Sequence, residues 1–244
     1  MLTSVCERSY KEEGMSLIAI AENLWIYNGE AVPYFGLAYT TRMTVVRLSN
    51  GDILVHSPTR YDDALAREVA ELGPVKYLVT PNKLHHLFLP QWMERFPDAA
   101  CYGTPGLQEK RKDISFDGLL GENPEPGWEK DVDQTLFRGS FAMKEAVFFH
   151  RSSRTLILGD LIENFRMDHF HGWRRWVALL TGIVAPHGKT PIDWRLTFIF
   201  GRSKARAALR KMQAWRPDNI IIAHGECVIG HGSEFLARSF SWLK

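Results

Sequence analysis

Residues Tyr77 to His86 read Y-L-V-T-P-N-K-L-H-H and combine a strand, a break and two adjacent histidines. The run Val75 to Val79 is short, apolar and rich in β-branched residues, which is typical of a buried strand. Thr80-Pro81-Asn82 ends that strand, because proline donates no ladder hydrogen bond and restricts the residue before it. Two imidazoles in a loop at a strand end indicate a metal site. A helix cap and a solvent-facing side chain are the alternative interpretation.

Two further strands end in the same way downstream. Thr155 to Leu158 is an apolar run that is followed by Gly159-Asp160, and Asn219 to Ala223 is an apolar run that is followed by His224. Asp160 could also cap the next segment. Three strand-end loops thus present histidine or aspartate, and imidazole with carboxylate is a ligand set that suits zinc, iron or manganese.

The central strands predict a hairpin. Ala146 to Phe149 and Thr155 to Leu158 flank H-R-S-S-R, so Arg151 to Arg154 would form the turn. Antiparallel pairing then sets Phe149 opposite Leu156. The same register brings Glu145 and Asp160 together at the far end of the hairpin.

The rest of the chain alternates between strands and helices. Helices are predicted where apolar residues share one face and Asp or Gly marks an end, and Asn50-Gly51 predicts a tight turn. The further strands are Leu24 to Tyr27, Leu37 to Leu48, Ile53 to His56 and Ala99 to Tyr102, and the helices include Asp62 to Leu72 and Arg202 to Trp215.

Residues 165 to 195 are harder to interpret. Asp168, His169 and His171 lie close together, but histidines two apart at a helix start face different ways, which favours a solvated surface. Trp173 and Trp176 would share a helix face, and we expect them to pack in the core. The tryptophan-rich residues 173 to 194 could also cover the site as a lid.

Composition excludes several classes of protein. The chain has 244 residues, of which 45% are hydrophobic and 24% charged, as in ordinary globular proteins. A net charge of +2 gives no reason to expect nucleic acid or an anionic membrane as a partner. Residues 1 to 14 lack the apolar segment of a signal peptide and are expected to form a loose extension before a single domain, 15 to 244. We expect a cytoplasmic protein, with a homodimer possible.

The motifs P-N-K-L-H-H, F-F-H-R-S-S-R-T-L and L-G-D-L resemble the metallo-β-lactamase fold superfamily, in particular a bacterial branch known only as a domain of unknown function. The resemblance implies an α/β (α+β) fold, a four-layer αββα sandwich of two mixed β-sheets flanked by helices. It also implies a metal site at one edge of the sheets.

The superfamily motif H-x-H-x-D-H falls on Pro81, Lys83, His85 and His86. The first two histidines of the motif are therefore missing, and His85 replaces its aspartate. Residues 132 to 145 contain no histidine, so the third histidine of the first metal position is missing too. By the same resemblance, Asp160 matches the bridging aspartate and His224 the final histidine.

These matches imply one metal ion, zinc before iron or manganese, held by His85, His86, Asp160 and His224 or by three of them plus water. Lys83 would place an ammonium where the missing metal sat, or would remain exposed. Glu145 would orient a histidine or act as a general base.

The resemblance favours a hydrolase that uses a metal-bound water on an ester, phosphoester or amide. A non-catalytic binding protein with a structural or empty site is the first alternative. A mononuclear non-haem iron oxidoreductase is the second.

Overall fold

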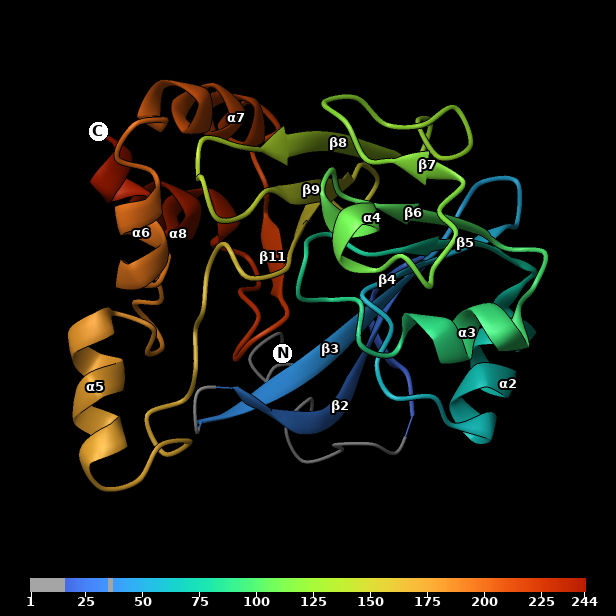
Figure 1. Cartoon of the computed structure of the whole chain (residues 1–244), viewed down its shortest axis with the longest axis horizontal. Helices are drawn as coiled ribbons and strands as arrows, with labels where there is room; N and C mark the ends of the chain where they lie inside the picture. Colours follow the sequence, from blue (N-terminus) through green and yellow to red (C-terminus); the bar gives the residue numbers. More distant parts are fainter. Residues whose placement is uncertain (1–15, 35–36) are drawn as a thin grey trace.

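The computed structural model describes residues 16–34 and 37–244. The expected N-terminal extension, residues 1 to 14, lies outside the described residues. Two β-sheets face each other, and helices lie outside both of them (Figure 1). Within the described ranges, no helix is long and apolar enough to cross a bilayer.

The larger sheet has seven strands in the order of the sequence. Strands β1 to β4 pair antiparallel, and β4 to β7 pair parallel. The predicted Asn50-Gly51 turn joins β3 to β4, and Gly51 takes a positive φ of 89°. The strands are β1 (Ile18–Ala21), β2 (Leu24–Tyr34), β3 (Leu37–Arg47), β4 (Ile53–His56), β5 (Val75–Val79), β6 (Ala100–Gly103) and β7 (Gly118–Leu119).

The smaller sheet has the order β11-β10-β9-β8. The predicted hairpin register is confirmed, because Phe149 pairs with Leu156. Strand β11 runs parallel to β10, so both strands end at the same edge of the sheet. The strands are β8 (Val132–Phe137), β9 (Glu145–His150), β10 (Thr155–Leu158) and β11 (Asn219–Ile222).

The apolar side chains form three layers of core. Between the sheets, Leu24, Val46 and Leu54 pack with Phe148 and Ile157. Each such side chain stabilises the native state by about 1.5–3 kcal/mol through burial. The two outer faces of the sheets are covered by helices α2 (Asp63–Leu72) and α3 (Leu89–Arg95) on the larger sheet, and by α7 (Arg202–Ala214) and α8 (Gly232–Ser239) on the smaller one. The predicted four-layer αββα sandwich is confirmed.

The interpretation of residues 165 to 195 was wrong in one respect. Two helices, α5 (Trp173–Thr181) and α6 (Ile192–Thr197), form in this segment. The short helix α4 (Leu107–Lys110) lies earlier in the chain, between β6 and β7. Trp173 and Trp176 do not pack in the core, because each is 69% exposed. The reason is that α5 turns only Ala178 inward, while the apolar stripe with both tryptophans faces out.

Candidate metal centre

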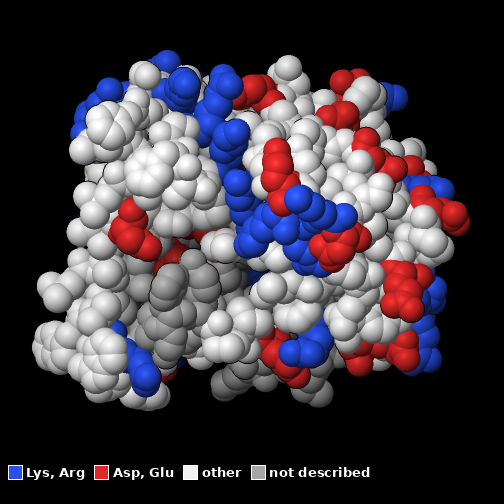
Figure 2. All heavy atoms as spheres, in the orientation of Figure 1, with Lys and Arg blue, Asp and Glu red and all other residues white. Residues whose placement is uncertain are grey.

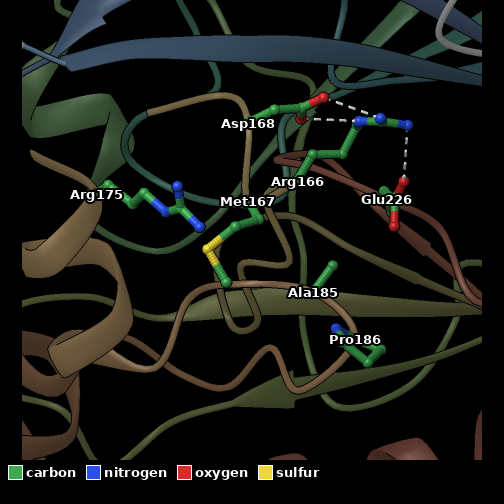
Figure 3. A pocket seen from close by; sticks show the side chains of 7 residues that line it. All are labelled: Arg166, Met167, Asp168, Arg175, Ala185, Pro186 and Glu226. Atoms are coloured by element: carbon green, nitrogen blue, oxygen red, sulfur yellow. Dashed lines mark hydrogen bonds and ion pairs between the residues drawn. The ribbon is translucent and has the colours of Figure 1, made fainter. Parts of the chain in front are cut away.

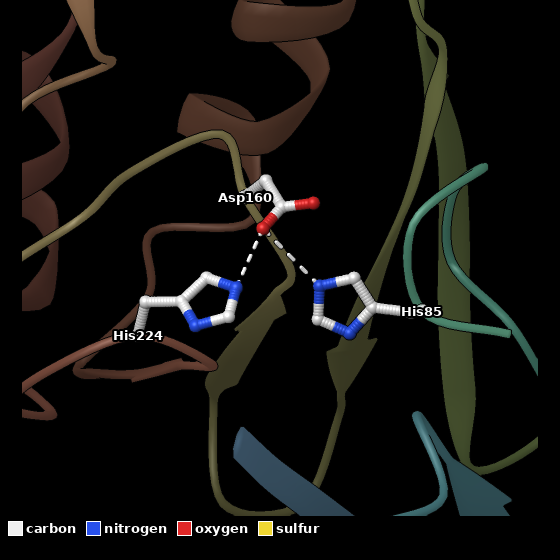
Figure 4. A group of neighbouring side chains, drawn as sticks. All are labelled: His85, Asp160 and His224. Carbon is white, nitrogen blue, oxygen red and sulfur yellow. Dashed lines mark ion pairs between the residues drawn. The ribbon is translucent and has the colours of Figure 1, made fainter. Parts of the chain in front are cut away.

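Three strand ends converge at one edge of the two sheets. His85 follows β5, Asp160 follows β10 and His224 follows β11. The parallel pairing of β10 with β11 explains why Asp160 and His224 emerge side by side. His85 reaches them from the facing sheet, so the candidate centre bridges the two halves of the sandwich (Figure 4).

The three side chains point at one another. The Nε2 atoms of His85 and His224 lie 3.2 Å and 2.7 Å from Oδ1 of Asp160. One ligand atom from each residue falls within 4.8 Å of the other two. Asp160 and His224 are buried and His85 is partly exposed, so the group can be reached from one side.

Hydrogen bonds fix the orientation of both histidines. Nδ1 of His224 donates to the carbonyl oxygen of Thr40 at 2.6 Å, so in the neutral ring Nε2 carries the lone pair. Nδ1 of His85 lies 2.5 Å from the hydroxyl oxygen of Ser57. Partners of this kind orient metal-binding histidines in proteins. The donor set therefore fits a divalent ion bound by two Nε2 atoms and one carboxylate.

Asp160 is held as an anion. Its Oδ2 accepts a hydrogen bond of 2.7 Å from the side-chain amide of Asn82. Burial raises the pKa of Asp160, but the facing His85 and His224 outweigh that effect and leave the pKa well below its usual range. A charged carboxylate between two imidazoles is what a cation site requires.

Glu145 has a different position from the one we expected. Its carboxylate accepts hydrogen bonds from the backbone N–H groups of Gly159 (2.9 Å) and Asp160 (2.7 Å) and from Asn82 (3.0 Å). It has no hydrogen bond to His86 or His224, because the hairpin register places the start of β9 beside the end of β10. Burial and the charge of Asp160 raise the pKa of Glu145 to about 7. Glu145 is buried and thus positions Asp160 from behind.

His86 does not join the group of three. Its Nδ1 lies 2.6 Å from Nη1 of Arg111. A guanidinium can only donate, so Nδ1 accepts and Nε2 carries the proton. A protonated Nε2 is a hydrogen-bond donor and not a ligand. Burial, with the charges of Lys110 and Arg111, lowers the pKa of His86 to about 4 and keeps the ring neutral.

The side chain of Lys83 lies beside Gly106. A β-carbon at Gly106 would lie 2.6 Å from Nζ of Lys83, so the side chain runs along that glycine. Lys110 is the lysine that lines the cavity beside the metal centre, and its Nζ donates to the carbonyl of Lys83 at 2.8 Å.

A cavity of about 480 Å³ opens onto the three candidate ligands. Its wall is mostly apolar, with Val32, Leu84, Leu87, Phe88 and Trp194, and its polar side chains include Tyr39, His86, Lys110 and Glu163. Burial raises the pKa of Glu163 to about 8, which favours the protonated carboxyl group at neutral pH. Pro191 and Trp194 also line the cavity, which places part of the suggested lid beside the site.

The sequence interpretation missed four residues of the site. Ser57 and Thr40 orient the histidines, Asn82 holds Asp160, and Glu163 lines the cavity. Asn82 alone had a local signal, because it follows a strand end and its side chain accepts from the backbone of Leu84.

The cluster of Asp168, His169 and His171 does not reach the metal centre. Asp168 pairs with Arg166 at 3.0 Å, and Nε2 of His169 lies 2.7 Å from the carbonyl oxygen of Ala38. Among the described residues, the ligand atoms of His85, Asp160 and His224 are the ones that lie close enough together to hold an ion.

Comparison with solved structures finds the same fold in metallo-β-lactamases. The enzyme from Pontibacter korlensis aligns over 93% of this chain and 97% of its own, with 11% identity and a TM-score of 0.63. The enzyme from Erythrobacter litoralis, with β-mercaptoethanol in its active site, covers 93% and 95% at 9% identity and a TM-score of 0.63. The enzyme from Hirschia baltica covers 93% and 96% at 13% identity and a TM-score of 0.57.

These identities are low, so the likeness establishes the fold and leaves the activity open. A comparison with curated proteins finds no match. The profile of a domain of unknown function, DUF4336, matches residues 22–171, which is more than half of the chain. The chain has a metallo-β-lactamase fold and belongs to the DUF4336 family.

Proposed function

We propose that the protein is a metal-dependent hydrolase with one divalent ion, zinc in preference to iron or manganese, bound by His85, Asp160 and His224. The observation that carries the proposal is the set of three ligands at the floor of an accessible cavity. Catalytic zinc sites have three protein ligands and keep a position for water or substrate, whereas structural sites are closed by four. His86, the ligand that would have closed the site, is turned to Arg111.

A divalent ion held there would supply a Lewis acid that polarises an ester, phosphoester or amide and makes water acidic enough to attack it. The chain's own residues would do the rest. The Nε2–H group of His86 donates a hydrogen bond to a substrate oxygen, and the protonated carboxyl group of Glu163 gives a proton to the leaving group. Lys110 binds an anionic group, while Phe88 and Trp194 contact an apolar part of the substrate.

The ligand set also supports a second candidate. Two histidines and one carboxylate with open positions form the facial triad of non-haem iron oxygenases. The group of His85, Asp160 and His224 has this composition. Iron in place of zinc would make the protein an oxidoreductase, and a non-catalytic protein would turn over no substrate with any metal.

The test is an activity assay on metal-stripped protein that is reloaded with zinc, manganese or, without air, ferrous iron. Chromogenic esters, phosphodiesters and amides serve as substrates. We expect turnover that requires the metal and falls by about 10²–10⁴-fold in Glu163→Gln, as for loss of a general acid. His171→Ala, an exposed histidine outside the cavity, is the matched control and keeps full activity.

Two outcomes would contradict hydrolysis. Oxygen consumption by the ferrous protein alone would favour the oxidoreductase. Turnover that persists in chelator, or in a His224→Ala variant, would assign the reaction to a contaminant.

A further inference from the structure

Helix α5 has its apolar stripe on the outside of the molecule. Trp173, Trp176, Val177 and Leu180 follow the i, i+3, i+4, i+7 spacing of one helix face, and they are 69%, 69%, 41% and 83% exposed. Ala178 is the buried residue of the helix. A stripe with this spacing normally faces a core, so an outward stripe of this size indicates a surface that binds something.

Helix α6 and the turn after it extend the same surface. Leu196, Ile199 and Phe200 are 67%, 59% and 93% exposed. The guanidinium of Arg195 donates to the carbonyl of Thr181 at 3.0 Å and thereby joins α6 to the end of α5. We call the exposed apolar side chains of both helices and of the turn after α6 the α5–α6 face, comprising Trp173, Trp176, Leu180, Leu196, Ile199 and Phe200.

The segment that forms the α5–α6 face is basic. Residues 173 to 200 contain four basic residues, Arg174, Arg175, Lys189 and Arg195, and one acidic residue, Asp193, although the whole chain is nearly balanced with 30 basic and 28 acidic residues. In Figure 2 the left part of the molecule, over α5 and α6, is mostly uncharged, with an acidic group on it and basic side chains above it and at its lower end. We expected no membrane partner because the net charge of the whole chain is only +2. That total does not show that basic residues outnumber acidic ones in this segment.

The arginines of α5 are available to a partner. The guanidinium of Arg175 has no hydrogen bond or ion pair with any described residue and points into a hollow of about 460 Å³ beside the helix (Figure 3). Arg166 borders the same hollow, but Asp168 and Glu226 pair with it. Arg174 stacks over the ring of Trp173 at 5.5 Å and is exposed.

Charge decides between the possible occupants. A second copy packed on this face would bring the exposed Arg174 and Arg175 of both copies to one interface, at a cost in repulsion. An anionic bilayer complements both features, because Trp, Phe and Leu insert at the headgroup boundary while Arg and Lys bind lipid phosphates. We propose that the α5–α6 face docks the protein on the surface of an anionic membrane. The proposal goes beyond the proposed hydrolysis and does not depend on it.

The orientation has a consequence for the cavity. Two residues of α6 line the cavity beside the candidate metal ligands: Pro191 caps the start of the helix, and Trp194 lies in its first turn. Docking through α6 would hold the mouth of that cavity close to the lipid surface. Its mostly apolar wall would then meet molecules that partition into the bilayer.

The test is co-sedimentation of the full chain with vesicles of phosphatidylcholine, with and without phosphatidylglycerol. We expect binding to the anionic vesicles that weakens with salt. Arg174→Gln with Arg175→Gln should reduce the partition constant about 30-fold, for the loss of two charges. Trp176→Ser with Leu180→Ser should reduce it by about 100-fold or more, for the loss of two inserted side chains.

Matched controls come from the opposite side of the sandwich. Lys76→Gln and Leu119→Ser change an exposed charge and an exposed apolar side chain of the seven-stranded sheet, and both should bind as the wild type does. Equal binding to neutral vesicles, or no binding to either kind, would overturn the proposal. So would a concentration-dependent doubling of mass in sedimentation analysis that Trp176→Ser with Leu180→Ser abolishes, because a second copy would then occupy the face. Binding of duplex DNA instead of vesicles would overturn it as well.

Discussion

Asn82 links the two buried carboxylates at the candidate metal centre. Its amide nitrogen donates to Asp160 at 2.7 Å and to Glu145 at 3.0 Å, and its amide oxygen accepts from the backbone of Leu84 at 2.8 Å. One side chain therefore fixes the carboxylate ligand and shapes the loop that delivers His85. A short polar side chain directly after a strand is well suited to this double role.

We predict that Asn82→Ala weakens metal binding about 10–100-fold, as the loss of a group that orients a ligand does. The two carboxylates would also lose a shared donor, which lowers the free energy of unfolding by about 1–3 kcal/mol. Competition with a chromogenic chelator measures the first effect and urea unfolding the second.

Asn219→Ala is the matched control for Asn82→Ala. The Asn219 side chain bonds the carbonyl of Ser153 and the N–H group of Gly230, at the opposite end of the strands from the centre. This variant should lose stability and keep its metal affinity. Unchanged affinity in Asn82→Ala would contradict the positioning role.

His150 gives a pH-dependent prediction at the other end of the hairpin. It is 2% exposed, and burial lowers its pKa below the ordinary value of 6.5, while Asp131 acts weakly in the opposite direction. As the pH falls, His150 therefore binds a proton more readily in the unfolded chain than in the folded one. The contribution to stability is complete above pH 6.5 and is lost as the pH falls toward the lowered pKa.

In urea unfolding between pH 7.5 and pH 5, we expect His150→Gln to lose less stability than the wild type over the same interval. Chelator in both samples removes any contribution of the metal. An identical pH dependence in the two proteins would show that His150 keeps its ordinary pKa.

Among the elements, strand β3 ties the two sheets together through Arg42. The side chain is 4% exposed and bonds Asn28 at 2.8 Å within its own sheet. It also donates to the carbonyl groups of Ile222 and, at 2.7 Å, of Gly225, which flank His224. A side chain from the larger sheet thus donates hydrogen bonds to the backbone around His224, the candidate ligand that follows β11 of the smaller sheet.

Arg42→Met should lower the free energy of unfolding by about 3–5 kcal/mol, because several hydrogen bonds of a buried charge are lost together. It should also weaken metal binding, because the His224 loop loses its anchor. Arg47→Met, an exposed position in the same strand, should change neither. Urea unfolding and metal titration of both variants make the comparison, and equal stabilities would contradict the role of Arg42.

For the whole molecule, a metal that binds only the folded state adds its binding free energy to folding. At a free concentration of 100 times the dissociation constant, the gain is about 2.7 kcal/mol. For a domain of this length that corresponds to a rise in Tm of about 5–10 °C. Differential scanning fluorimetry with zinc and with chelator measures this difference, and in His85→Ala with His224→Ala it should vanish. A wild-type shift no larger than that of the variant would show that the ion does not bind the native state.

Strong local signals explain why much of the fold could be predicted. Ile53–His56, Val75–Val79 and Thr155–Leu158 are short apolar runs with turn residues beside them, and the structure has the same bounds. The stripe of α5 could not be placed, because its spacing predicts a helix without saying whether the stripe faces the core. Tertiary context decides that question.

The candidate site shows the same division. Positions at strand ends pointed to His85, Asp160 and His224, and the structure brings the three together: β10 and β11 are parallel neighbours, and His85 follows β5 of the facing sheet. The position of His86 depends on Arg111, which lies 25 residues away and reaches it only through the packing of the loop after α4. A contact between residues so far apart in the chain leaves no local pattern in the sequence. The position of Glu163 in the cavity could not be predicted for the same reason.

The central claim is a single ion held by three residues, and elemental mass spectrometry of the purified proteins tests it most directly. We predict about one equivalent of metal in the wild type and in His86→Ala. We predict little or none in His85→Ala, Asp160→Ala and His224→Ala after the same purification. Loss of the metal in His86→Ala, or two equivalents in the wild type, would contradict the three-ligand site.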